Sequence, residues 1–145
     1  MTKYVNIING PNLNLLGQRQ PEIYGADTLE TVQQACEALA ATAGLSVRML
    51  QSNSEGALVD MIQAARHDAA GIIINAGAYS HTSIAILDAL NTFDGPVLEV
   101  HVSNIYQRED FRHHSHISAR ANGVMAGFGA QGYELALRRM ITLLA

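Results

Sequence analysis

Short apolar runs alternate with longer amphipathic stretches along the 145 residues of this chain. Short runs rich in β-branched residues and closed by Gly, Pro or Asn are typical of strands, whereas apolar residues at positions i, i+3 and i+4 are typical of helices. The pattern predicts strands at Tyr4–Ile8, Leu45–Leu50, Gly71–Asn75, Pro96–Val102 and Val124–Phe128. It predicts helices over 27–43, 54–67, 82–90 and 130–144.

Polar residues and glycine mark the ends of two predicted helices. Asp27, followed three residues later by Glu30, is an N-cap signature. Gly44 predicts the end of the same helix, because glycine readily takes the backbone conformation that closes a helix. Ser54 is the expected N-cap of the next helix.

Strands that alternate with helices predict an α/β fold, with a parallel sheet and right-handed crossovers. A five-stranded, flavodoxin-like order is the natural expectation at this length, with helices on both faces of the sheet. The third strand is apolar enough to be covered on both faces. Because no repeat or linker interrupts the pattern, residues 1–145 are expected to form a single domain.

Composition narrows the possible partners. The net charge of −4 argues against nucleic acid, although Arg108 and Arg112 form a local basic cluster among histidines. Cys36 is the sole cysteine, so no intrachain disulfide can form and a reducing, cytoplasmic setting fits. The first apolar run is too short for a signal peptide, and no apolar stretch approaches the ~20 residues that span a bilayer. We therefore expect no membrane partner.

Polar segments follow three of the predicted strands. Sheets of this kind bind ligands beyond the carboxyl ends of their strands, so these segments are the place to look for chemistry. The first, 10–27, contains Asn12, Asn14, Arg19 and Tyr24, although most residues of this type in a loop are merely solvated or packed. A long loop without periodicity is nevertheless unusual in a compact domain and is often functional.

The segments after the third and fourth strands carry further candidates. Asn75 and His81 supply side-chain donors, unless the segment is only a turn that caps a helix with Ser80 or Thr82. Glu99 and His101 share one face of the fourth strand, because side chains on a strand repeat every second residue. A carboxylate beside an imidazole can orient it and raise its pKa, as suits a general acid. A purely structural histidine is about equally compatible with this pattern.

Ser103 and the arginine that follows it extend the second candidate group. The amides of Val102 and Ser103, with the Ser103 hydroxyl, could hold an anion at the end of the strand. Arg112 follows with a planar fork that matches a pair of oxygen atoms.

Two other signals are weaker than they look. His113, His114 and His116 resemble a metal-binding run, but they lack the cysteines or the HExxH spacing typical of zinc sites. The segment Gly127–Gly132 reads G-x-G-x-x-G, yet too little chain follows it for the second strand that a dinucleotide site requires. Close packing of helix on sheet is the better interpretation of these glycines.

Four motifs together resemble the type II 3-dehydroquinate dehydratases over essentially the whole chain. They are Asn9-Gly-Pro-Asn-Leu-Asn-Leu-Leu-Gly17 with Arg19, Pro21 and Tyr24-Gly25; Asn75-Ala-Gly-Ala-Tyr-Ser-His-Thr-Ser83; Glu99-Val-His-Val-Ser-Asn-Ile105 with Arg108-Glu109 and Phe111-Arg-His-His-Ser115; and Gly123-Val-Met-Ala-Gly-Phe-Gly-Ala-Gln-Gly-Tyr133. The resemblance implies a flavodoxin-like fold. It also implies conversion of 3-dehydroquinate to 3-dehydroshikimate and water, by anti elimination through an enolate.

The resemblance implies no metal, organic cofactor or Schiff base. The single lysine, Lys3, stands at the very start of the chain, which fits a lysine-free mechanism. The pathway would be the shikimate route to aromatic amino acids or the breakdown of quinate.

The resemblance also assigns catalytic roles. Tyr24 would be the base that takes the proton next to the ketone, and Arg19 would favour its ionised form. Asn12 would hold a water against the enolate oxygen. His101 would protonate the departing hydroxyl, with Glu99 orienting it.

The substrate-binding positions implied by the resemblance are Asn75, His81, Val102, Ser103 and Arg112. The amides and hydroxyl at 102–103 would take the carboxylate, and His81 and Arg112 would take ring hydroxyls. Asp88 would reach the site of a neighbouring subunit in a homo-oligomer, a dodecamer built as four trimers. Residues 18–25 would close as a lid over bound substrate.

The departures from the family pattern, at Ala76, Leu87 and His116, fall on no catalytic position. Two other functions remain open at this point. One is a flavin- or phosphate-responsive binding module of flavodoxin type, and the other is an enzyme acting on a different hydroxyketo acid.

Overall fold

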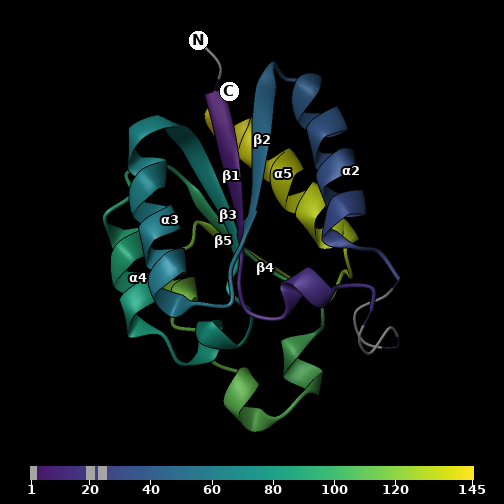
Figure 1. Cartoon of the computed structure of the whole chain (residues 1–145), viewed down its shortest axis with the longest axis vertical. Helices are drawn as coiled ribbons and strands as arrows, with labels where there is room; N and C mark the ends of the chain where they lie inside the picture. The colour runs from purple at the N-terminus through teal and green to yellow at the C-terminus, as the bar shows by residue number, and fades with distance from the viewer. Residues whose placement is uncertain (1–2, 19–21, 23–25) are drawn as a thin grey trace.

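The computed structural model describes residues 3–18, 22 and 26–145, which form one parallel sheet covered by helices (Figure 1). The strands are β1 (Lys3–Asn9), β2 (Leu45–Gln51), β3 (Ala69–Asn75), β4 (Val97–His101) and β5 (Gly123–Ala126). The helices are α2 (Leu29–Ala41), α3 (Glu55–Asp68), α4 (Ile84–Asn91) and α5 (Gln131–Leu144). All five predicted strands are therefore confirmed, with ends shifted by a few residues.

The strand order is β2-β1-β3-β4-β5, and every neighbouring pair is parallel. The chain runs from β1 to β2 on one side and then crosses back to β3 on the other side of β1. The predicted flavodoxin-like order is thus confirmed. The switch between β1 and β3 lets the loops after these two strands part, which opens the position where sheets of this order bind ligands.

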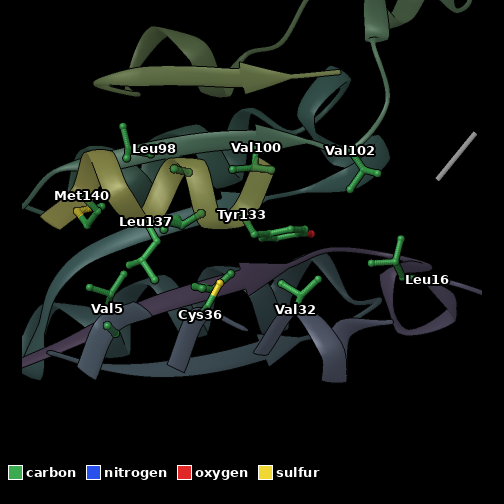
Figure 2. Close-up of a cluster of buried hydrophobic side chains, with 14 residues drawn as sticks. Val5, Leu16, Val32, Cys36, Leu98, Val100, Val102, Tyr133, Leu137 and Met140 are labelled. Carbon is green, nitrogen blue, oxygen red and sulfur yellow. The ribbon is translucent and has the colours of Figure 1, made fainter. Parts of the chain in front are cut away.

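Helices cover both faces of the sheet, as the apolar third strand predicted. On one face α2 and α5 pack against the strands, with Cys36 of α2 and Leu137 of α5 in the same buried cluster (Figure 2). On the other face α3 and α4 bury Leu58, Ile62 and Leu90. Neighbouring strand residues point to opposite faces.

Two predicted helix starts are wrong by a residue or more. The N-cap of α2 is Thr28, not Asp27, because the Thr28 and Thr31 hydroxyls each accept a hydrogen bond from the other residue's backbone N–H, at 3.2 and 3.0 Å. The N-cap of α4 is Ser83, whose hydroxyl accepts from the Ile86 N–H at 2.9 Å, so neither Ser80 nor Thr82 has that role. The Ser54 cap of α3 is confirmed.

Much of the chain outside these elements is folded into 3-10 turns. They are η1 (Leu13–Leu15), η2 (Gly77–His81), η3 (Ile105–Gln107), η4 (Asp110–Arg112) and η5 (Ile117–Ala119). The described parts of the polar segments that follow β1, β3 and β4 thus contain these short turns. In the described part of the chain, no helix is both long and apolar enough to cross a membrane.

Glycines occur in the turn after β5 and at the start of α5, where this helix packs on the sheet. A Cβ atom on Gly132 would lie 3.4 Å from Met125 Cγ and 3.6 Å from Val100 Cγ1, in ordinary van der Waals contact with the sheet. Gly127 has a φ of +87°, a conformation that favours glycine, and β5 ends just before it. These contacts agree with the packing interpretation of the G-x-G-x-x-G segment.

At Gly10 the segment after β1 lies directly against the segment after β3. A Cβ atom there would lie 2.3 Å from the Ala76 carbonyl oxygen, which is backbone and has little room to move. We expect Gly10→Ala to lower the free energy of unfolding by about 2 kcal/mol or more, as overpacking does. Urea unfolding followed by circular dichroism measures this.

Gly56→Ala is the matched control. Gly56 lies exposed in the first turn of α3, where a Cβ would meet nothing closer than 3.9 Å. This change should raise stability by up to about 1 kcal/mol, since alanine is the better helix former. Equal stability changes in the two variants would contradict the close approach of β1 and β3.

Candidate active site

A cavity opens beyond the carboxyl ends of β1, β3 and β4, the position that the sheet order predicts. It holds about 710 Å³ of empty space, part of which is open solvent. Its lining comes from three segments and consists of Pro11, Asn12, Leu13, Leu16, Asn75, Gly77, Ala78, His81, His101, Val102, Ser103, Ile105, Arg108 and Arg112.

The cavity brings together most of the predicted site residues. Asn12, Asn75, His81, His101, Val102, Ser103 and Arg112 all line it. Glu99 lies behind His101 and does not line the cavity. Asp88 lies on the exposed side of α4, away from the cavity lining. Arg19 and Tyr24 lie outside the described residues.

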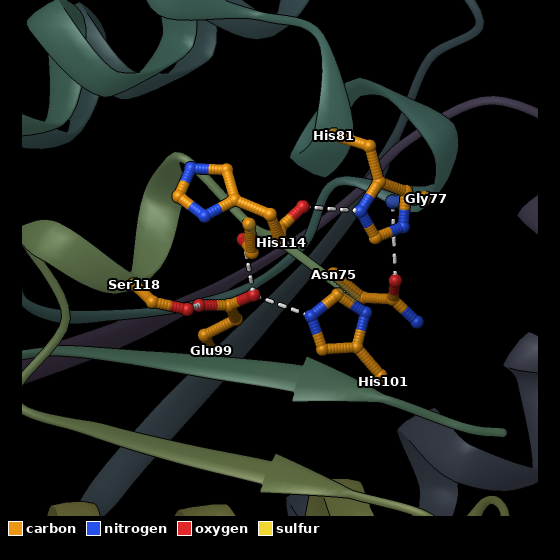
Figure 3. A network of polar contacts seen from close by, with 8 residues as sticks. Asn75, Gly77, His81, Glu99, His101, His114 and Ser118 are labelled. Atoms are coloured by element: carbon orange, nitrogen blue, oxygen red, sulfur yellow. Dashed lines mark hydrogen bonds and ion pairs between the residues drawn. The ribbon is translucent and has the colours of Figure 1, made fainter. Parts of the chain in front are cut away.

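Glu99 and His101 form a buried pair on β4 (Figure 3). Only 1% of Glu99 and 5% of His101 is exposed. The Nε2 atom of His101 is hydrogen-bonded to Oε2 of Glu99, as the two-residue spacing on a strand predicted. Nδ1 is therefore the ring nitrogen of His101 that remains for a ligand in the cavity.

Two serines complete the surroundings of the Glu99 carboxylate. The Ser115 hydroxyl donates to Oε2 at 2.7 Å, and the Ser118 hydroxyl donates to Oε1 at 2.6 Å. Burial alone would raise the pKa of Glu99, but the hydrogen bonds from His101, Ser118 and Ser115 outweigh burial and lower it. Glu99 is therefore an ionised carboxylate at neutral pH.

The sequence pattern did not single out either serine. Both come from the polar segment 103–122, and their alignment with a carboxylate on β4 arises only from the tertiary fold. Ser115 closes one of the motifs quoted above, which was the only signal available for it.

His81 stands opposite His101 with its ring roughly parallel, at 6.1 Å between centroids and 21° between planes. Its Nδ1 atom lies 2.8 Å from the His114 carbonyl oxygen, which can only accept, so Nδ1 carries the hydrogen. Burial lowers the pKa of His81, and the nearby His101 and Arg112 lower it further, against the opposing effect of the His114 carbonyl. His81 is thus neutral at pH 7, and its Nε2 is a hydrogen-bond acceptor.

Asn12 is held in an unusual backbone conformation at the cavity edge. Its φ of +69° is the only positive value of a non-glycine residue in the described part of the chain. Asparagine tolerates this left-handed region better than most residues. The Asn12 N–H donates to Oδ1 of Asn53 at 3.0 Å, which anchors the turn to the loop after β2.

Two arginines bring positive charge to the cavity. Arg112 donates from Nε to Glu109 at 2.7 Å, and this hydrogen bond lowers the pKa of the Glu109 carboxyl. Nη1 of Arg108 lies 3.5 Å from the Ser103 hydroxyl. In the sequence, Arg108 belonged to a basic cluster and to one of the family motifs but was given no role, and the structure places it in the cavity lining, near Ser103. In a chain of net charge −4, this local positive charge suits an anionic ligand.

The three histidines between Arg112 and η5 do not point toward a common centre but make separate contacts. The rings of His114 and His116 meet edge to face, with centroids 5.0 Å apart, while His113 contacts the Arg108 carbonyl oxygen. Among the residues that the structure describes, no group of three His, Cys, Asp or Glu side chains is placed to hold a metal ion.

Comparison with known proteins identifies the family. The model of the family described as dehydroquinase class II matches residues 3–141. The chain belongs to the class II dehydroquinase family. A 3-dehydroquinate dehydratase of Cereibacter sphaeroides is 63% identical over 145 residues, covering 100% of this chain and 99% of that protein. One from Streptomyces avermitilis is 63% identical over 140 residues, covering 96% of this chain and 88% of that protein.

A solved structure supports the fold assignment independently of the sheet order. The crystal structure of a type II dehydroquinase from Propionibacterium acnes aligns with a TM-score of 0.92 and 44% sequence identity, covering 98% of each chain. At this similarity the class II dehydroquinase fold extends over nearly all of the chain.

The two serines generate a prediction about pH. Because the pKa of Glu99 lies below its ordinary value of 4.5, its ionisation stabilises the fold above that pH and ceases to do so as pH falls. The double variant Ser115→Ala/Ser118→Ala should raise this pKa. Its loss of stability, measured by urea unfolding, should be largest near pH 7 and shrink as pH drops through and below 4.5.

Ser46→Ala, on edge strand β2, is the control and should change stability little at any pH. A stability loss in the double variant that stays constant across the same pH range would mean that the serines act only through packing.

Proposed function

We propose that this chain is a 3-dehydroquinate dehydratase, a hydro-lyase that removes water from 3-dehydroquinate by anti elimination and yields 3-dehydroshikimate. Membership in the family and the names of its relatives support the substrate. The observation that carries the proposal is the buried Glu99–His101 pair, which stands at the wall of a cavity bordered by two arginines.

His101 is the general acid of the proposed reaction. The ionised Glu99 carboxylate accepts the hydrogen of Nε2 and holds the ring with Nδ1 toward the cavity. In the protonated ring Nδ1 carries a proton that can pass to the departing hydroxyl group, so that this group leaves as water. A positioned acid of this kind is typically worth a rate factor of about 10² to 10⁴.

Tyr24 is the proposed base, and its assignment rests on the family resemblance. Tyrosine has an ordinary pKa of about 10, so its ionisation at pH 7 costs roughly 4 kcal/mol. The positive charge of Arg19 would offset part of this cost. Loss of the proton next to the ketone leaves an enolate, and Asn12 would hold a water molecule against the enolate oxygen.

The cavity lining supplies matching contacts for the rest of the substrate. The amides of Val102 and Ser103, with the Ser103 hydroxyl, bind the carboxylate, and the positive charge of Arg108 beside Ser103 suits that role. The neutral His81 accepts a hydrogen bond at Nε2 from a ring hydroxyl. Arg112 binds a second ring hydroxyl. The proposed elimination requires no metal or organic cofactor.

The oligomeric state, the cellular compartment and the pathway are proposed from the resemblance to the type II 3-dehydroquinate dehydratases. Asp88 is exposed on α4, as a residue that contacts a neighbouring subunit would be in an isolated chain. It would reach the neighbouring subunit's site in a dodecamer built as four trimers. The enzyme would act in the cytoplasm, in aromatic amino acid biosynthesis through the shikimate pathway or in quinate breakdown.

The direct test is to add 3-dehydroquinate to the folded protein and follow the absorbance of the enone product. The proposal predicts a steady rise that depends on enzyme concentration. Absence of any rise from a protein shown to be folded would rule out the proposed reaction.

Two variants separate the proposed base from the proposed acid. Tyr24→Phe should abolish both elimination and solvent exchange of the hydrogen next to the ketone, while substrate binding persists. His101→Ala should reduce elimination by roughly 10² or more but leave this exchange far less affected, since His101 acts after the enolate forms. Exchange is followed by NMR in deuterated water. Equal loss of exchange and elimination in His101→Ala would contradict the division of roles.

A further inference from the structure

A row of buried polar side chains lies behind the cavity, on the side of Asn75. Asn9 at the end of β1, Tyr133 in the first turn of α5 and Asn75 at the end of β3 are all 3% exposed or less. Figure 2 shows the Tyr133 ring among apolar side chains, with its hydroxyl directed toward the side of the cluster where Leu16 and Val102 lie. A polar group in such a place is costly unless it is fully hydrogen-bonded.

The hydrogen bonds of this row run in one direction only. The Leu50 carbonyl oxygen can only accept, so the Asn9 side chain presents Nδ2 to it at 3.1 Å. Oδ1 of Asn9 therefore faces Tyr133, whose hydroxyl must donate to it, at 2.7 Å. The Tyr133 oxygen can still accept a hydrogen bond, and Nδ2 of Asn75 donates to it at 2.9 Å.

The hydrogen bond to the side-chain oxygen of Asn75 is consistent with this direction. The Gly77 N–H can only donate, and it donates to Oδ1 of Asn75 at 3.2 Å. Both neighbours thus require the same orientation of the Asn75 amide, which is otherwise ambiguous for this type of side chain. Burial raises the pKa of Tyr133, so its hydroxyl stays protonated and the direction persists at any working pH.

One hydrogen of the Asn75 amide is left over. Nδ2 carries two hydrogens, Tyr133 takes one, and no described residue accepts the other. Asn75 also lines the cavity, beside His101 and Gly77 (Figure 3). The row therefore presents a single N–H donor to whatever oxygen atom a ligand places there.

We propose that Tyr133 is a positioning residue, which holds the Asn75 amide with one N–H facing the cavity so that it donates to an oxygen atom of the bound substrate. The proposal rests on the proposed function for the identity of that substrate, 3-dehydroquinate. The orientation of Asn75 itself does not depend on it. Tyr133 lies in the core and is not part of the cavity lining, so its effect on binding passes through Asn75.

The kinetic test is a double-mutant cycle with Tyr133→Phe and Asn75→Ala. Phenylalanine keeps the shape of the ring and removes only the hydroxyl, so Asn75 loses the acceptor that holds it. We expect KM for 3-dehydroquinate to rise about tenfold with a smaller change in kcat. In the Asn75→Ala background, Tyr133→Phe should change KM by less than about twofold. The same rise in both backgrounds, or no rise in either, would overturn the proposal.

A second measurement needs no turnover. The side-chain amide signals of Asn75 are assigned by their loss in Asn75→Ala and compared by ¹⁵N NMR between the wild type and Tyr133→Phe. Tyr133→Phe should shift both signals and speed their exchange with solvent, and unchanged signals would overturn the proposal. If the wild type fails to convert 3-dehydroquinate, the proposed function is wrong, and the NMR comparison still decides the role of Tyr133.

Leu137→Met is the matched control, because Leu137 lies one helical turn further along α5 and is fully buried without polar contacts. It should leave both KM and the Asn75 signals unchanged. Should Tyr133→Phe fail to fold, Asn9→Ala breaks the row at its other end by removing the acceptor of the Tyr133 proton. It should disturb the same Asn75 signals, and undisturbed signals would overturn the proposal equally.

Discussion

The buried negative charge of Glu99 is the constraint on which the rest of the site depends. A carboxylate with 1% of its surface exposed is very unfavourable unless donors surround it, and here a histidine and two serines do so. The histidine is on the same strand, but Ser115 and Ser118 come from the loop that folds back over it. The charge therefore links the folding of that loop to the electrostatics of His101.

The topology of the sheet brings the other groups to the same place. Parallel strands end at one edge, and the change of direction between β1 and β3 lets the turns after them border a common cavity. Gly10 permits the close approach of these turns, since any side chain there would collide with the Ala76 backbone. Asn75 on β3 and His101 on β4 thereby line the same cavity.

Periodicity was enough to predict much of the fold, and part of the site. The two-residue repeat placed Glu99 and His101 on one face, because it depends on local geometry alone. The alternation of strands and helices predicted a parallel sheet, whose flavodoxin-like order was expected from the chain length and from the family resemblance. The hydroxyl contacts of Ser115, Ser118 and Tyr133 were not predictable in this way. They join positions 16, 19 and 124 residues from their partners, and only the tertiary fold brings such positions together.

The helix caps and the catalytic roles also separate what the sequence could predict from what it could not. Thr28 replaced the expected Asp27 because several neighbouring residues can cap a helix and small differences in geometry choose among them. The roles of Tyr24 and Arg19 stay predictions from the family resemblance, since both lie outside the described residues. The placement of His81 and Arg112 at the cavity was expected, but the neutral state of His81 follows from its burial in the folded chain, which lowers its pKa.

The pH dependence of the stability of Glu99→Gln, measured by urea unfolding, tests the central claim most directly. Glutamine keeps the shape of the side chain and removes the buried charge that His101, Ser115 and Ser118 surround. Because the pKa of Glu99 lies below its ordinary value in the folded protein, we expect the loss of stability relative to the wild type to be largest near pH 7 and to shrink as pH falls through and below 4.5. A loss that stays constant over this pH range, or no loss at any pH, would contradict a stabilising buried charge.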